Sequence, residues 1–216
     1  MNQSTHLRIE DWGLLEYQQA LDRQNELVQQ HLSGSGRDTL VLVEHPATVT
    51  LGRRATSAEL RLPESEVLAR KLSLQRINRG GLATAHEPGQ LVAYPVLLLK
   101  KRDLHWFSSN FLTVVIKLLA DYGLRGELKS GEPGVWVEGR KICSFGIALK
   151  KWICSHGIAL NVNNDLSTFA AIIPCGRPSE ELTTMSREVG FLLDLTEVKQ
   201  RFCQHFMQVF AYDREL

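Results

Sequence analysis

The fold is decided by one stretch of the chain, GVWVEGRKICSFGIALKKWICSHGIALN, which runs from Gly134 to Asn161. Short apolar runs alternate here with polar pairs, first Glu138–Gly139 and then the residues around Lys150–Trp152. Apolar runs of this length, separated by tight-turn residues, are typical of antiparallel strands joined by hairpin loops. The stretch therefore predicts three consecutive β-strands.

The same stretch contains a near-repeat. ICSFGIAL at residues 142–149 and ICSHGIAL at residues 153–160 differ at a single position. Two copies are too few for a solenoid, which needs at least three stacked repeats. We interpret the copies as the two arms of one hairpin that line the same cavity, and chance similarity is the alternative.

Outward from this stretch, the chain mixes helical and strand-like patterns. Apolar residues recur at helical spacing over residues 14–32, 107–122 and 196–211. Short apolar runs predict further strands near residues 7–12, 39–45, 47–52, 72–77 and 91–99. Pro95, in the last of these, is expected to force an edge position or a bulge because proline cannot donate to a strand ladder. Together the patterns predict an α+β fold in a single domain over residues 1–216.

Composition excludes several classes of protein. The 216 residues carry 25 Lys and Arg against 24 Asp and Glu, so there is no broad basic face for nucleic acid. Local basic clusters at residues 53–54, 100–102 and 150–151 could meet an acidic partner. The N-terminus lacks the features of a signal peptide, and the longest apolar run, Leu91–Leu99, is too short to span a membrane. A cytoplasmic protein that binds neither membrane nor nucleic acid is expected.

Motifs for cofactors and metals are missing from the sequence. Four cysteines occur without a CxxC pair, so neither a zinc site nor a disulfide framework is expected. No GxxxxGK[ST] phosphate loop occurs, and HEPGQ at residues 86–90 lacks the second histidine of a zinc protease. The segment NRGGLATAHEPGQ, residues 78–90, could cradle a polar headgroup with its amides or merely turn.

Among the cysteines, Cys175 stands apart. Cys203 lies beside the apolar stripe of a helix, and Cys143 and Cys154 lie within predicted strands, where a buried structural thiol is the usual role. Cys175 instead lies between a proline and a glycine in IIPCGRPSEELTTMS, residues 172–186. From its position alone, a nucleophile and an inert loop residue are equally good interpretations.

A nucleophilic thiol needs a base or a cation nearby, because its ordinary pKa is about 8.5. Lys141 precedes Cys143 by two residues, so strand alternation predicts that their side chains share a face. His86 and His156 are the other candidate partners. These residues alone leave Cys143 and Cys175 both open as the nucleophile.

Four segments together carry a resemblance. RGGLATAHEPGQLVAYPV, EPGVWVEGRKICSFG, HGIALNVNNDLSTF and IIPCG, in this order, resemble the lipoyl(octanoyl) transferases, which are bacterial octanoyl-carrier-protein:protein transferases. The resemblance runs from about Leu40 to about Met185. It implies a mixed β-sheet with flanking helices, similar to the catalytic domains of biotin and lipoate protein ligases, and it implies no cofactor and no metal.

The resemblance also assigns roles to residues. It implies that Cys175 carries the acyl group and that Lys141 lowers the pKa of this thiol, which selects Cys175 over Cys143. The acyl-substrate contacts that it implies, together with the residues between them, are Arg79, Gly80, Gly81, Leu82, Ala83, Thr84, Ala85, His86, Ser144, Phe145, Gly146, Gly157, Ile158 and Ala159.

The activity implied is transfer of an octanoyl group from octanoyl-acyl carrier protein to a lysine of a lipoyl domain. The implied acceptors are the lipoyl domains of 2-oxoacid dehydrogenases and the glycine cleavage H protein. Alternatives are an ATP-dependent lipoate or biotin ligase of the same fold, a non-catalytic acyl-binding paralogue, and a cysteine hydrolase, for which no local Cys-His-Asn signature is visible.

Two positions depart from the family pattern. Ala85 stands where a large aromatic residue is usual, and the lost ring is expected to widen the acyl slot or to open it to water. Glu87 stands where glycine is usual, and a carboxylate beside His86 is expected to favour the charged imidazolium unless it points away.

Overall fold

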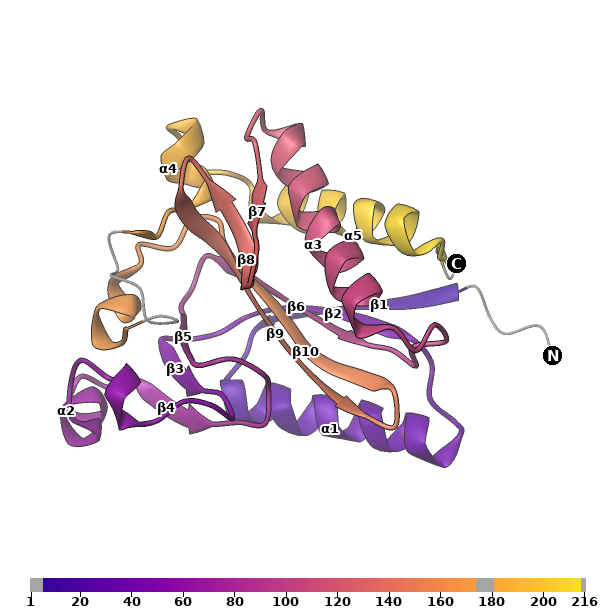
Figure 1. The fold of residues 1–216 in the computed structure, drawn as a ribbon, viewed down its shortest axis with the longest axis horizontal. Helices are drawn as coiled ribbons and strands as arrows, with labels where there is room; N and C mark the ends of the chain where they lie inside the picture. The colour runs from indigo at the N-terminus through magenta and orange to yellow at the C-terminus, as the bar shows by residue number, and fades with distance from the viewer. Residues whose placement is uncertain (1–5, 174–180, 215–216) are drawn as a thin grey trace.

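The computed structural model describes residues 6–173 and 181–214 and is built on an eight-stranded mixed sheet (Figure 1). The strand order is β11-β1-β2-β6-β10-β9-β8-β7; the β11–β1 and β1–β2 pairs are parallel and the others antiparallel. The strands are β1 His6–Leu14, β2 Thr39–Glu44, β6 Gln90–Val96, β7 Glu127–Lys129, β8 Glu132–Val137, β9 Arg140–Lys150, β10 Ile153–Asn161 and β11 Asp213–Arg214. The predicted mixed sheet is confirmed.

A second, three-stranded sheet lies beside the first. Its order is β4-β3-β5, from β3 Thr48–Leu51, β4 Ser73–Arg76 and β5 Ala83–His86. The α2 helix, Glu64–Ala69, and the 3₁₀ turns η1, Ser57–Glu59, and η2, Ser167–Ala171, flank this sheet. The sequence predicts strands at β3 and β4, but short apolar runs do not specify which strands pair, so the separate sheet could not be predicted.

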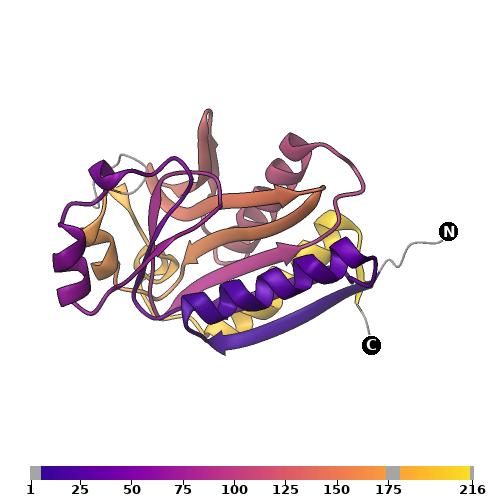
Figure 2. The same cartoon turned by 90° about the horizontal axis from the view of Figure 1, so that it is seen from below.

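Helices cover both faces of the large sheet (Figure 2). The α1 helix, Tyr17–Ser33, packs on one face, and the α3 and α5 helices, Leu104–Asp121 and Leu195–Phe210, pack on the other. In β2, Leu40 and Leu42 join the cluster under α3 and α5, whereas Val41 and Val43 join the cluster under α1. A strand buried on both faces shows such a continuous apolar run. No helix in the described part of the chain is long and apolar enough to cross a bilayer.

The near-repeat forms a hairpin, as predicted. Two-residue loops join β8 to β9 and β9 to β10, and both residues of each loop have positive φ: 48° and 77° at Glu138 and Gly139, and 50° and 65° at Lys151 and Trp152. Such loops match the twist of antiparallel strands. Gly146 pairs with Gly157, so the glycines of the two copies meet at the centre of the hairpin.

Pro95 does not force an edge. β6 lies between β2 and β10, so it is an interior strand. The irregularity falls on its neighbour: the β10–β6 ladder runs only from Asn161 to Ile158, and His156 then takes a φ of 56°. The N–H of His156 donates to Gln24 Oε1 of α1 at 2.9 Å instead of to a strand. Proline has no N–H to donate across a ladder, and beside it the His156 N–H leaves the ladder and is satisfied by the Gln24 side chain.

Gly157 permits close approach of β6, which makes its substitution diagnostic. A Cβ at residue 157 would lie 1.9 Å from the Ala93 carbonyl oxygen and 2.9 Å from Pro95 Cδ. We expect Gly157→Ala to lower the free energy of unfolding by about 3 kcal/mol, measured by urea denaturation. Gly80→Ala is the control, because its Cβ would meet only the Ile147 carbonyl oxygen at 3.5 Å. Equal stability of the two variants would contradict this packing.

Candidate active site

A cavity of about 160 Å³ lies between the large sheet and the segment that leads into β5. Most of the expected substrate-contacting residues line it together with Lys141: Arg79, Gly81, Leu82, Ala83, Thr84, His86, Ser144, Phe145, Gly146, Gly157, Ile158 and Ala159. Sequence reasoning missed Tyr17, Val92, Tyr94 and Pro133, which also line it. Val92 and Tyr94 alternate along β6, so strand alternation is the signal that could have found them.

Two expected contacts do not reach the cavity. The Gly80 N–H donates to the Ile147 carbonyl at 3.0 Å and fixes the loop to β9. Ala85 is fully buried in the core of the small sheet, because alternation along β5 turns its side chain away from Thr84 and His86. The expectation that Ala85 widens or opens an acyl slot is therefore wrong.

Lys141 reaches the cavity because of an irregularity in the ladder. Lys141 pairs with Trp136 but Cys143 pairs with Val135, so Ile142 has no residue opposite it. Such a bulge reverses the alternation between the strand segments on either side. The expectation that Lys141 and Cys143 share a face is wrong: Lys141 lines the cavity, and Cys143 lies in the core under α3 and α5.

Lys141 is almost entirely shielded from solvent outside the cavity. Its side chain is buried, and Nζ lies 5.1 Å from the centroid of the Trp136 ring. The Lys141 carbonyl accepts from the Thr183 N–H at 3.0 Å, and Leu182 forms a parallel bridge to Lys141. The chain that follows Cys175 thus comes back beside the start of β9. Cys175 itself lies outside the described residues.

The other cysteines are poor nucleophiles. Burial raises the pKa of Cys143 to about 12, and the charge on Lys141 only partly offsets this effect. Burial also raises the pKa of Cys154 above its ordinary value. Cys203 is buried on α5, away from the cavity. Since only the thiolate is nucleophilic, neither strand cysteine suits acyl transfer at neutral pH.

Arg79 lines the cavity and also holds the glycine-rich loop. Its Nη1 donates to the Gly80 and Leu82 carbonyls at 3.0 and 2.9 Å. Its Nη2 donates to the carbonyl and Oγ1 of Thr50 at 3.0 and 2.8 Å. A Cβ at Gly146 would lie 2.9 Å from the Gly80 carbonyl oxygen and 3.1 Å from Arg79 Cδ, so this approach requires glycine. The loop is therefore a fixed wall of the cavity.

His86 is neutral, with its tautomer set by Gln90. The Gln90 amide group donates to the Asn161 Oδ1 and the Ala85 carbonyl, which leaves Gln90 Oε1 to accept the Nδ1 proton of His86 at 2.9 Å. The Nε2 of His86 is consequently the unprotonated nitrogen. Burial, followed by the effect of His45, holds the pKa of His86 well below its usual value.

Glu87 points away from His86. One carboxylate oxygen accepts from the Leu166 N–H and from Asn164 Nδ2 at 2.6 and 2.9 Å, and the other accepts from the Thr168 N–H at 2.9 Å. The carboxylate therefore holds the segment that begins η2 and does not charge the imidazole. From the sequence, Glu87 is expected to favour the charged form of His86 unless its carboxylate points away from the ring. The carboxylate does point away.

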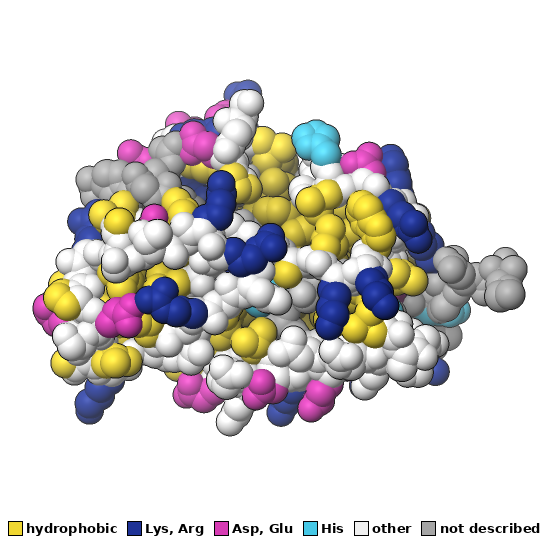
Figure 3. Space-filling view, turned by 60° about the horizontal axis from the view of Figure 1, so that its bottom comes forward, with side chains coloured by type: hydrophobic (Ala, Val, Ile, Leu, Met, Phe, Trp, Pro, Cys, Tyr) yellow, Lys and Arg dark blue, Asp and Glu magenta, His cyan; other side chains and the backbone are white. Residues whose placement is uncertain are grey.

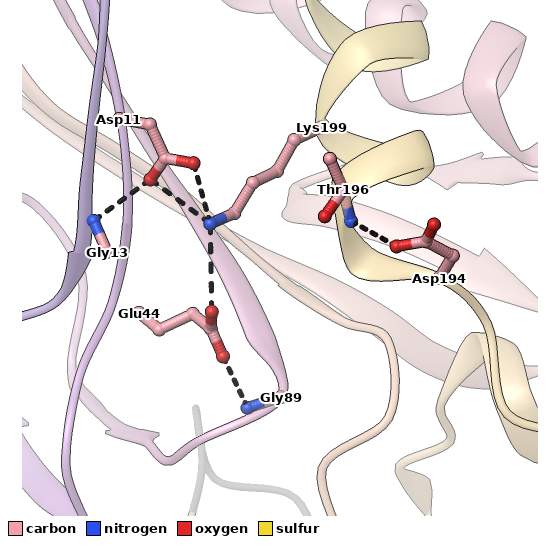
Figure 4. A network of polar contacts seen from close by, with 7 residues as sticks. All are labelled: Asp11, Gly13, Glu44, Gly89, Asp194, Thr196 and Lys199. Atoms are coloured by element: carbon pink, nitrogen blue, oxygen red, sulfur yellow. Dashed lines mark hydrogen bonds and ion pairs between the residues drawn. The ribbon is translucent and has the colours of Figure 1, made fainter.

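The loop after His86 is also anchored from α5 (Figure 4). The Gly89 N–H donates to Glu44 Oε2 at 2.9 Å. Lys199 Nζ lies 3.6 Å from the other oxygen of Glu44 and 3.0 Å from Asp11 Oδ2. Lys199 on α5 thus forms ion pairs with two carboxylates beside the loop.

The floor of the cavity is a neutral aromatic cluster. His45 Nδ1 donates to the Leu15 carbonyl at 2.7 Å, so its Nε2 accepts from the Tyr94 hydroxyl at 2.8 Å. Tyr17 is hydrogen-bonded to Tyr94, and its ring stacks on His86 with centroids 5.4 Å apart. Burial lowers the pKa of His45 to about 4 and raises that of Tyr17 to about 12. These groups carry no charge near neutral pH.

The chain is similar over most of its length to proteins of one family. The family model of the lipoyl protein ligase A/B catalytic domain matches residues 16–207. The octanoyltransferase of Rubrobacter xylanophilus is 44% identical over 200 residues, covering 91% of this chain and 90% of the relative. That of Thermosynechococcus vestitus is 41% identical over 207 residues, covering 93% and 88%.

The chain belongs to the lipoyl protein ligase A/B catalytic domain family. Within this family its relatives are acyltransferases, and so is this chain.

Solved structures of lipoate and biotin ligases share the fold. A putative lipoate protein ligase from T. acidophilum with bound lipoic acid has a TM-score of 0.77 at 18% identity, covering 97% of this chain and 88% of that one. A lipoate-protein ligase A bound with ATP has a TM-score of 0.76 at 16% identity, covering 99% and 90%. The biotin protein ligase of Aquifex aeolicus has a TM-score of 0.56 at 15% identity, covering 95% and 70%. The expected similarity to lipoate and biotin ligases is confirmed.

The buried histidines predict how stability of this family member depends on pH. The pKa values of His45, His86 and His156 are lowered from 6.5, to about 4 for His45 and His156, mainly by burial. The unfolded chain therefore binds more protons between about pH 6.5 and 4, so the free energy of unfolding falls as pH drops through this window. We expect urea denaturation to show a loss of several kcal/mol between pH 7 and 5, at up to about 1.4 kcal/mol per pH unit for each histidine.

A matched variant isolates the contribution of one histidine to the pH dependence of stability. His45→Gln is expected to remain folded at pH 7 and to lose about one third of the slope below pH 6.5. A free energy of unfolding that does not change between pH 7 and 5 would contradict neutral burial of the three histidines.

Glu87 gives a second prediction. Glu87→Gln places an NH₂ group among N–H donors, so we expect it to lower the free energy of unfolding by about 2–3 kcal/mol. Glu66→Gln, at an exposed helical pair with Arg70, is the control and is expected to change stability by less than about 0.5 kcal/mol. Denaturant unfolding of both variants measures the difference, and similar small losses would show that the Glu87 carboxylate does not hold η2.

Proposed function

We propose that this protein transfers an octanoyl group from octanoyl-acyl carrier protein to a lysine of a lipoyl domain through a thioester on Cys175. The observation that carries the proposal is a largely apolar cavity beside a buried lysine, in a chain whose relatives are octanoyltransferases. The proposed acceptors are the lipoyl domains of 2-oxoacid dehydrogenases and the glycine cleavage H protein.

The cavity suits a saturated acyl chain. Its floor is formed by Val92, Ala159 and the neutral rings of Tyr17 and Tyr94. Each methylene that leaves water contributes about 0.8 kcal/mol, so a slot of limited depth can select chain length. A volume of about 160 Å³ is comparable to an engineered apolar cavity that accommodates benzene. The chain is proposed to extend from this floor toward Lys141.

Cys175 is the proposed nucleophile, and two observations support this proposal. Cys143 and Cys154 are buried with raised pKa values. Thr183, hydrogen-bonded to the Lys141 carbonyl, follows Cys175 by eight residues. An ammonium group next to a thiol favours the thiolate, which gives Lys141 its proposed role.

The reaction is proposed to take two steps. The Cys175 thiolate attacks the thioester carbonyl of the carrier, the carrier sulfur leaves, and Lys141 supplies the proton that it gains. The neutral amine of the acceptor lysine then attacks the thioester carbonyl on Cys175, the bond from the acyl carbon to the Cys175 sulfur breaks, and the thiolate is regenerated as the amide forms. Lys141 takes up the proton that the nitrogen loses. Exchange of thioesters is nearly neutral and amide formation from a thioester is downhill, so neither step requires ATP.

A lipoate ligase is the second candidate, since lipoate-protein ligase A bound with ATP shares the fold. A similar fold occurs in a bi-partite lipoate protein ligase from Thermoplasma acidophilum, described with its E2 lipoyl domain, at a TM-score of 0.76 and 16% identity. Addition of octanoate, lipoate and ATP in place of the carrier thioester separates the two candidates, because a ligase would modify the lipoyl domain under those conditions.

Intact-protein mass spectrometry tests the proposed intermediate. Wild type mixed with octanoyl-acyl carrier protein is expected to gain one octanoyl group, which moves to a lipoyl-domain lysine on addition of that domain. Cys175→Ser is expected to gain no octanoyl group that can move to the lipoyl domain. Lys141→Met keeps the apolar stem but removes the charge, so we expect the adduct to form about 10²–10⁴-fold more slowly.

Cys143→Ala is the matched control. It removes a thiol two residues from Lys141 and is expected to leave adduct formation unchanged. An adduct that persists in Cys175→Ser but disappears in Cys143→Ala would overturn the assignment, and absence of any adduct in wild type would favour a non-catalytic acyl-binding protein.

A further inference from the structure

Two basic segments that are about fifty residues apart in the sequence meet in the fold. Lys100–Arg102 follow β6, and Lys150–Lys151 lie at the turn between β9 and β10. The Leu99 N–H donates to the Trp152 carbonyl at 2.9 Å, and Leu98 bridges Ile153. The five basic side chains are exposed, so this end of the hairpin presents a concentrated positive charge.

The charge continues to the mouth of the cavity. Arg54 is exposed and lines the cavity, and Arg53 beside it donates its backbone N–H to the Arg79 carbonyl. Lys150 is four residues beyond the cavity-lining Gly146, or about 13 Å along the strand. We call these residues the basic rim: Arg53, Arg54, Lys100, Lys101, Arg102, Lys150 and Lys151. Several Lys and Arg side chains are spread across the middle of the view in Figure 3.

The basic rim is not neutralised by carboxylates in the described part of the chain. Elsewhere on the surface, arginines pair with acids, as in Arg70–Glu66 and Arg76–Glu64. None of the seven rim residues makes such an ion pair with a described residue. The nearby Asp103 instead caps α3 by accepting from the Trp106 N–H. Because the whole chain carries a net charge of only +1, the rest of the molecule is net negative.

Apolar groups accompany these cations. Leu104 and Leu149 are 43% and 37% exposed, and Lys101 Nζ lies 4.8 Å from the Trp106 ring centroid. Apolar and aromatic contact area with charged residues around it is the composition of a protein–protein interface. A protein surface with an acidic face therefore fits this end of the molecule.

We propose that the basic rim docks the acidic face of the protein that delivers the acyl chain, with its thioester directed to the cavity mouth near Arg54. This proposal rests on the proposed function, because it names the surface that the acyl donor uses. Opposite charges on two proteins raise the rate of association and fix orientation, and salt weakens both effects. The rim thus acts on capture of the donor, and the buried Lys141 acts on the chemistry.

Comparison of two donors tests the proposal. Octanoyl-acyl carrier protein presents the acyl chain on a protein, whereas octanoyl-pantetheine presents the same thioester without one. For Lys100→Glu/Lys151→Glu, we expect kcat/KM with the carrier to fall about tenfold or more at low salt and kcat/KM with octanoyl-pantetheine to stay within about twofold. The control is Lys71→Glu/Lys117→Glu, an equal change of charge at two exposed lysines, Lys71 after α2 and Lys117 on α3. It should behave as wild type with both donors.

The outcomes are distinguishable. Equal losses with both donors, or no loss with the carrier, would overturn the docking surface. If wild type uses neither donor, the proposed function fails. Calorimetry with the carrier protein then tests the docking surface by itself. Binding that is lost only in the rim variant supports the docking surface, and absence of binding to wild type overturns it. Rim-dependent sedimentation with anionic phosphatidylglycerol vesicles, with carrier binding unchanged, would assign the rim to a membrane instead.

Discussion

The architecture depends on the absence of side chains at one place, the glycine pair at the centre of the β9–β10 hairpin. Gly157 lets the Ala93 carbonyl of β6 approach on one side, where any Cβ would overlap it. Gly146 lets Arg79 and Gly80 approach on the other. The near-repeat therefore has a physical meaning, because each copy supplies one of the two positions where backbone packs directly against backbone. The cavity is the space left when the sheet and the glycine-rich loop are held this close.

A second constraint connects the two sides of the cavity. His86 is fixed by Gln90, Gln90 by Asn161, and the Asn161 amide group donates to the Thr183 carbonyl at 3.1 Å. Thr183 in turn donates to the Lys141 carbonyl. A buried polar network in which each amide is satisfied is rigid, because a shift of one member would leave the next unpaired in a low-dielectric site. The orientation of His86 and the position of the chain beside Lys141 are consequently set together.

The sequence predicts local structure well where a pattern has one physical meaning. Tight turns at Glu138–Gly139 and Lys151–Trp152 require positive φ, and the strands follow from them. Prediction fails where an irregularity changes a face, because the bulge at Ile142 turns Lys141 and Cys143 to opposite faces. At Pro95 the strand is interior rather than an edge, and the irregularity appears as the left-handed backbone of His156 on the neighbouring strand. The residues of the cavity floor could not be predicted for another reason, since Tyr17 and Tyr94 come together only through tertiary packing. Glu87 shows the same limit, because its partners lie almost eighty residues away.

The distribution of charge separates recognition from chemistry. The basic rim is exposed to solvent, where charges farther apart than the Debye length, about 8 Å at physiological ionic strength, are largely screened from one another. Lys141 is buried against Trp136, where screening is much weaker. Between them the floor of the cavity is neutral, because burial suppresses charge on its histidines and tyrosines. An apolar chain can thus pass between two positive regions without displacing a charged group. Changes in salt act mainly on the outer region and much less on the electrostatics around Lys141.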